Sequence, residues 1–212
     1  MAKAFKIFVI MLIRMRVERL RNWVRPHQVV FEGLKSGDYK TDSRFKELFA
    51  VGLMTMGLDC SEEVFLESLS SREEAPDVKI LGCQWNDILN EMNINYVEVV
   101  SWTEHADENC LGAFLERTKL NGVYDYQEET AILCLIEREM DYPHWQNLSE
   151  RVSETMASNG RHFWPIFALN KVEGAVYQYR LVQLYPEIHP ITFNVIMPTF
   201  HGRQKDQLTL RV

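Results

Sequence analysis

The sequence lacks the short motifs that mark the common nucleotide-dependent and metal-dependent enzymes. It contains no P-loop, no GxGxxG behind a strand, no HExxH, no GxSxG and no EF-hand loop. Its four cysteines form no CxxC pair, and no histidine stands at zinc-finger spacing from them. The sequence therefore predicts no cofactor, no metal and no disulfide scaffold, and it favours a reducing, cytoplasmic compartment.

A long apolar run is also missing. The longest one, Ile7 to Ile13, is too short to cross a bilayer, and no small-residue cleavage site follows it. The sequence thus favours neither a membrane span nor a signal peptide. With 212 residues, 46% of them hydrophobic, the chain can bury a core of ordinary size.

Charge divides the chain into a basic arm, residues 1–27, and an acidic body, residues 28–212. The arm holds seven basic groups against Glu18 alone, while the body carries the excess of Asp and Glu. Five arginines of the arm are the candidate binding residues: Arg14, Arg16, Arg19, Arg21 and Arg25. Two interpretations remain open, a buried strand flanked by solvated arginines or a surface that contacts RNA or anionic membrane.

Periodicity predicts an α+β fold with a mixed or antiparallel sheet and five to six helices packed on it. An N-terminal strand over 5–17, followed by a helical turn over 18–24 that ends at Pro26, would join a C-terminal β-meander in that sheet. The other expected strands are 78–81, 95–102, 162–169, 175–185, 191–197 and 207–212. The expected helices are 43–57, 59–69, 85–92, 107–121, 125–136 and 143–160.

Two carboxylates resemble the acidic pair of metal-dependent nucleases. Asp77 follows Pro76, and Glu98 lies within a predicted strand. The lysine that such enzymes carry two residues beyond the glutamate is Val100 here. The alternative is that both are surface carboxylates that keep an acidic body soluble.

Cys110 is the candidate nucleophile, because a cysteine at a helix N-terminus is favoured as thiolate. His162, at the start of a predicted strand, would be its base, and Gln178 would orient the imidazole. Cysteine on a helix followed by histidine on a strand, over residues 105–178, resembles papain-like cysteine peptidases. Cys83 competes for the same role, and the alternative for Cys110 is a small buried apolar residue.

Taken together, the sequence predicts a non-enzymatic intracellular binding or regulatory protein. Its expected partner is a protein, with RNA or an anionic membrane contacted by the basic arm as the second. Compactness, the missing motifs and the aromatic content suit a small viral or phage accessory protein. The alternative is a papain-like cysteine peptidase that uses Cys110, or Cys83, with His162.

Overall fold

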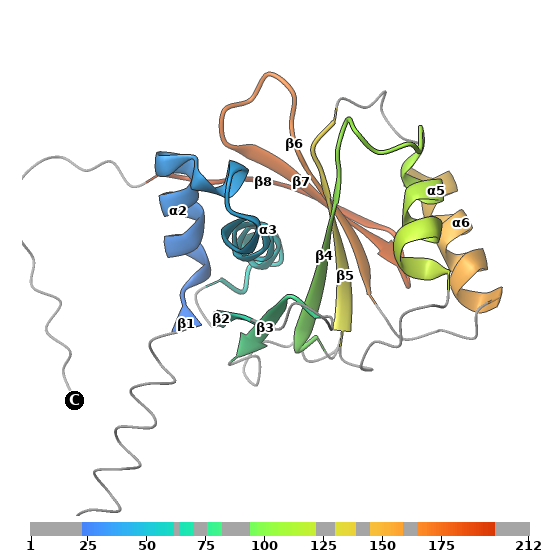
Figure 1. Ribbon diagram of the computed structural model, residues 1–212, viewed down its shortest axis with the longest axis horizontal. Helices are drawn as coiled ribbons and strands as arrows, with labels where there is room; N and C mark the ends of the chain where they lie inside the picture. Colours follow the sequence, from blue (N-terminus) through green and yellow to red (C-terminus); the bar gives the residue numbers. More distant parts are fainter. Residues whose placement is uncertain are drawn as a thin grey trace, which may run out of the picture.

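The computed structural model describes residues 23–61, 64–69, 76–81, 94–121, 130–138, 145–158 and 165–197. They form an eight-stranded mixed sheet with helices on both faces, so the predicted α+β class is confirmed (Figure 1). The strands are β1 Trp23–Val24, β2 Phe65–Ser68, β3 Val78–Leu81, β4 Tyr96–Trp102, β5 Thr130–Ile136, β6 Ile166–Lys171, β7 Gln178–Tyr185 and β8 His189–Asn194. The described residues contain four α-helices rather than five to six: α2 Pro26–Ser36, α3 Ser43–Gly57, α5 Leu111–Leu115 and α6 Trp145–Ser158.

The strands lie side by side in the order of the sequence. β1 to β4 are antiparallel, β4, β5 and β6 are parallel, and β6 to β8 are antiparallel again. The parallel steps require crossovers, and α5 and α6 lie in the segments that make them. One continuous sheet therefore joins the middle of the chain to the C-terminal meander.

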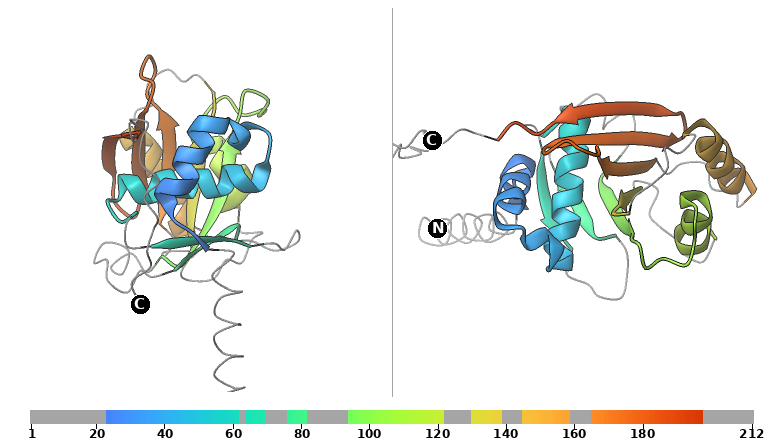
Figure 2. Two further views of the ribbon diagram at one scale, coloured as in Figure 1. Left: turned by 90° about the vertical axis from the view of Figure 1, so that its left-hand side faces the viewer. Right: turned by 90° about the horizontal axis from the view of Figure 1, so that it is seen from above.

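Helices cover both faces of the sheet, as Figure 2 shows from the side and from above, and a hydrophobic cluster lies on each face. α2 and α3 cover one face, with Leu53 and Met54 fully buried against it. α5 and α6 cover the other face, where Val152 and Met156 pack on the strands. α3 contacts strands from β2 to β8, so the sheet curves around this helix.

Two predicted helices are strands in the structure. Residues 65–68 form β2, and residues 130–136 form β5, which is buried along its whole length. The spacing of Ile132, Leu135 and Ile136 also suits a helix, but a central parallel strand buried on both faces reads as the same continuous apolar run. The helix predicted at 85–92 and the strands predicted at 5–17 and 207–212 lie outside the described residues.

Pro26 begins a helix instead of ending one. It occupies the first turn of α2, where its missing N–H costs nothing, and Gly37 closes the helix with a φ of 77°. Trp23 and Val24, predicted as helical, pair with β2 instead. No helix in the described part of the chain is long and apolar enough to cross a membrane.

Candidate active site

Asp77 stands where β3 and β4 separate. The two strands pair only through Val78 with Val97 and Lys79 with Tyr96. One step before β3, the Asp77 N–H donates to the Val97 carbonyl at 3.2 Å. The Val99 N–H then donates to Asp77 Oδ2 at 2.8 Å. Among the described residues, the Asp77 side chain thus takes the place of a strand partner for the Val99 N–H, which fixes the carboxylate beside β4.

Glu98 lies on β4 directly next to this contact. Its side chain is 7% exposed, which is rare for a carboxylate. One oxygen, Oε1, is ion-paired with the Nζ atom of Lys119. The other, Oε2, is buried and has no hydrogen-bond partner among the described residues. A buried carboxylate oxygen without a donor is costly. A protonated Asp77 can supply the donor, because a side-chain hydrogen bond with Glu98 is among the causes that raise the pKa of Asp77.

Lys119 contacts Glu98 from the crossover segment that follows β4. It lies on η3, Glu116–Leu120, a π-helical turn that continues α5. Its side chain is 14% exposed, so the ion pair is largely withdrawn from solvent. The structure therefore supplies an ammonium group next to Glu98, although the position two residues along the strand is Val100.

A third carboxylate, Glu47, approaches from α3. Burial first, and then the negative charges of Asp77 and Glu98, raise the pKa of Glu47 to about 7. Burial and the charge of Glu98 raise the pKa of Asp77 to about 6, despite the hydrogen bond from Val99. Burial and neighbouring negative charge thus disfavour the charged forms of both Glu47 and Asp77.

This arrangement suits a hard divalent cation. Within the described residues no three His, Cys, Asp or Glu side chains form a ready-made metal cage. Mg²⁺ does not need one, because it is commonly bound by one or two carboxylates, several waters and the phosphates of a substrate. Asp77 and Glu98 fit that pattern, since they are two carboxylates that lie next to one another.

The sequence identifies two of these four residues. Asp77 and Glu98 are recognisable from their local pattern, whereas Lys119 and Glu47 are not. No local signal marks either one, because Lys119 lies 21 residues beyond Glu98 and Glu47 lies in an ordinary amphipathic helix.

The proposed cysteine site is only partly described. Cys110 is exposed at the start of α5, so the alternative that it is a buried apolar residue is wrong. Its Sγ lies 3.7 Å from a guanidinium nitrogen of Arg151 on α6. Gln178 lies on β7, where its side-chain amide donates to Asn194 at 3.2 Å. Cys83 and His162 fall outside the described residues, so the peptidase prediction stays untested.

Of the five candidate binding arginines, the structure describes Arg25. Its guanidinium lies over the Phe65 ring at 3.8 Å from the centroid, and it donates to the Val64 carbonyl at 3.5 Å. These contacts tie the start of α2 to β2, so Arg25 has a structural role. The other four, Arg14, Arg16, Arg19 and Arg21, lie outside the described residues, and their binding role stays a prediction.

Comparison with known proteins gives no match: no protein-family model, no curated protein and no solved structure matches the chain.

Proposed function

We propose that the protein is a divalent-cation-dependent nuclease that hydrolyses phosphodiester bonds at Asp77, Glu98 and Lys119. One observation carries the proposal. The acidic pair that resembles metal-dependent nucleases lies side by side where the described pairing of β3 with β4 ends, and Lys119 on η3 places an ammonium group next to Glu98. The proposal departs from the non-enzymatic, cofactor-free protein expected from the sequence.

The cation would be held by Asp77 and Glu98. Both are fixed by the backbone of β4, one as a member of the strand and the other through the Val99 N–H. A bound cation would offset the negative charge that Asp77 and Glu98 exert on each other and on Glu47. It would polarise a phosphoryl oxygen and lower the pKa of a bound water.

The reaction assigned to the site is hydrolysis. A water oxygen forms a bond to phosphorus, one P–O ester bond breaks, and a proton of that water ends on the departing oxygen. The products are a phosphomonoester and a free hydroxyl. Asp77 and Glu98 would hold the cation, and the Lys119 ammonium, paired with Glu98, would place a positive charge next to the site where negative charge develops in the transition state.

The charge layout suits a nucleic-acid substrate. A polyanion is repelled by an acidic body, and the basic arm, residues 1–27, is the part of the chain that can offset this repulsion. The predicted contact between the arm and RNA is therefore compatible with the nuclease proposal. Binding of a protein partner remains a separate prediction.

The test is cleavage of end-labelled single-stranded DNA, duplex DNA and single-stranded RNA with Mg²⁺, Mn²⁺ or EDTA. We expect cleavage that needs a divalent cation and that falls by about 10²- to 10³-fold in Glu98→Gln and Lys119→Met. The matched controls are Glu154→Gln on α6 and Lys35→Met on α2, both exposed, which should cleave like the wild type.

Contamination by another nuclease is the main competing explanation for any activity. A contaminant would be insensitive to Glu98→Gln and Lys119→Met, so cleavage that survives both changes would sink the proposal. So would the complete absence of cleavage on all three substrates with either cation, provided that thermal unfolding shows a folded protein.

A further inference from the structure

The strand β8 forms one edge of the sheet, and no described strand pairs with its outer side (Figure 1). The strand at the opposite edge, β1, is only 2 residues long, which is a common protection of a sheet edge against pairing with other chains. β8 is longer, with 6 residues, and no charged side chain interrupts the sequence from Ile191 to Met197. β8 is therefore a long, uncharged edge of the kind that proteins normally cover.

The outward hydrogen-bonding groups of this edge belong to alternate residues. The Val195 N–H donates to the Tyr177 carbonyl at 2.8 Å, so the backbone of Val195 faces β7. This direction alternates in an antiparallel pair, and the residues whose N–H and carbonyl groups face away from β7 are Thr192, Asn194 and Ile196. Pro190, the next residue of this series, has no N–H to offer. A further strand can thus pair with the edge over residues 192–196.

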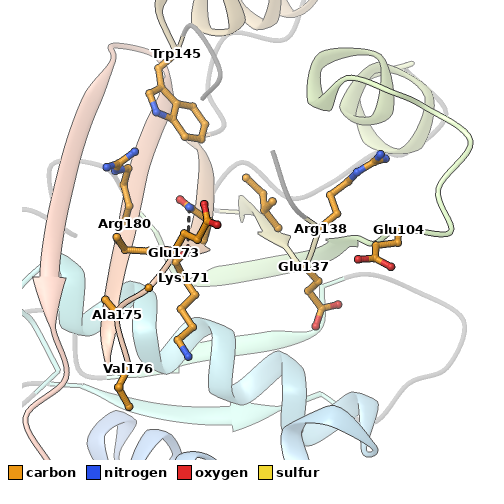
Figure 3. Close-up of a pocket in the computed structure, with 13 residues that line it drawn as sticks. Glu104, Glu137, Arg138, Trp145, Lys171, Glu173, Ala175, Val176 and Arg180 are labelled. Atoms are coloured by element: carbon orange, nitrogen blue, oxygen red, sulfur yellow. Dashed lines mark hydrogen bonds between the residues drawn. The ribbon is translucent and has the colours of Figure 1, made fainter. Parts of the chain in front are cut away.

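The two faces of β8 differ in polarity. Figure 3, a view of the cavity at the carboxyl ends of β5 and β6, shows Arg180 of β7 on the side of Trp145 of α6, whereas Lys171 of β6 extends toward α3. Thr192 is the register partner of Arg180, so Thr192 and Asn194 lie on the α6 side of the sheet, where both are exposed. The apolar side chains lie on the α3 side with the core cluster: Ile191, Phe193 and Val195.

The apolar face is incompletely covered at this edge. Phe193 stacks on Tyr179 with ring centroids 6.0 Å apart, but Phe193 and Ile191 are only partly buried. The large hydrophobic side chains that are exposed among the described residues also gather here: Val176, Tyr177 and Ile196. Ile196 is 81% exposed and precedes Met197, after which the chain continues with residues 198–212. The chain thus continues from an apolar corner that the described residues leave open.

The end of the sequence has the pattern that this edge requires. In the strand predicted at 207–212, QLTLRV, polar and apolar side chains alternate. In an antiparallel pair, directly opposite residues share a face of the sheet. With Leu210 opposite Phe193, the leucines and Val212 extend the apolar α3 side, and the polar residues join Thr192 and Asn194. Residues 197–206, which include Pro198 and Gly202, then make the reversal.

We infer that the C-terminal segment, residues 207–212, docks on the outer edge of β8 as a further antiparallel strand. It pairs with the outward backbone groups of residues 192–196 and covers Ile191 and Phe193. Because the segment belongs to the same chain, its effective concentration at the edge is high. A strand of another protein can add to β8 only by displacing it, so the segment guards the edge. None of these residues belongs to the candidate active site.

The experiment is NMR of the full chain at two protein concentrations. We expect an Hα–Hα NOE between Phe193 and Leu210, because opposite residues without mutual hydrogen bonds have the closest Cα atoms. We also expect slow amide exchange at Thr192 and Asn194 at both concentrations. Leu210→Lys should speed this exchange by at least about tenfold, since it places a charge on the core side.

The matched control is Thr209→Lys, which puts the same charge at the neighbouring position on the polar face and should leave the exchange unchanged. The Val195 N–H, bonded to Tyr177, is the internal control and should exchange slowly in all three proteins. Fast exchange at Thr192 and Asn194 in the wild type, or no NOE between Phe193 and Leu210, overturns the inference. Slow exchange that is lost on dilution assigns the edge to a second copy of the chain and overturns it as well.

Discussion

Replacing Asp77 by asparagine should stabilise the protein when no divalent cation is present. In the wild type the Asp77 carboxylate is held next to Glu98 and within the field of Glu47. The asparagine side chain would keep the hydrogen bond from the Val99 N–H, because its amide oxygen can accept it in place of Oδ2. The change therefore removes an unfavourable charge and preserves the local backbone contact.

The size of the effect follows from the pKa of Asp77, which rises from 3.8 to about 6 on folding. A shift of roughly two units corresponds to about 3 kcal/mol between the two protonation states. Because the group is partly open to solvent, we discount this to about 1.5 kcal/mol. For a chain of this size, that is an increase in Tm of about 3 to 6 °C.

The stabilisation expected from Asp77→Asn depends on pH. A carboxyl whose pKa is raised on folding binds more protons in the folded state, so it lowers stability progressively as the pH rises above 3.8 and reaches its full cost above about 6. The gain from Asp77→Asn should be complete at pH 8, about half as large at pH 5, and absent below pH 3.8.

The assay is thermal unfolding in EDTA at pH 8 and pH 5, followed by circular dichroism. Asp38→Asn, at an exposed aspartate, is the matched control and should change stability by less than about 0.5 kcal/mol. A loss of stability at pH 8 in Asp77→Asn would refute the reasoning, since it would make the carboxylate a structural acceptor that needs its charge.

Three further predictions concern the same region and the exposed cysteine. Lys119→Met should lower the free energy of unfolding by about 3 kcal/mol, because it leaves the buried Glu98 carboxylate without its cation. Adding Glu98→Gln should restore most of this loss, as a double-mutant cycle of chemical unfolding can show. Losses that simply add would contradict a direct pair. Mg²⁺ should raise the Tm of the wild type more at pH 8 than at pH 5, because protons compete for the carboxylates at the lower pH. The Tm of Asp77→Asn should show no such rise. An equal rise in both proteins would argue against the site. A thiol alkylator should modify the exposed Cys110 in the folded protein, as mass spectrometry can show. Cys134 is buried, and burial raises the pKa of its thiol, so it should react only after unfolding. Labelling of Cys134 at the same rate as Cys110 would contradict the packing.

Local signals in the sequence are sufficient for much of the fold. Asp42 caps α3 by accepting from the Arg44 and Phe45 N–H groups, and the apolar stripe behind it is the buried face of that helix. Alternation and turn residues also locate β4 and the meander strands. Such elements are predictable because caps, stripes and turns are satisfied by residues close in sequence.

The helix predicted over residues 125–136 is wrong, because β5 is determined by contacts with residues distant in sequence. A strand buried on both faces has no alternation, and its identity is decided by the parallel neighbours β4 and β6, which pair with it from either side. No pattern within Thr130–Ile136 distinguishes that environment from the interior of a helix.

The residues of the candidate site also differ in whether the sequence alone can predict them. The sequence by itself determined the acidic pair, since Asp77 follows Pro76 at a strand entrance and Glu98 lies in the adjacent predicted strand. Only the tertiary structure decided that Lys119 and Glu47 join them, because an ammonium group must be near Glu98 in space rather than at a set distance along the chain. The crossover after β4 returns η3 to that position, and the curvature of the sheet around α3 brings Glu47 within range of both carboxylates.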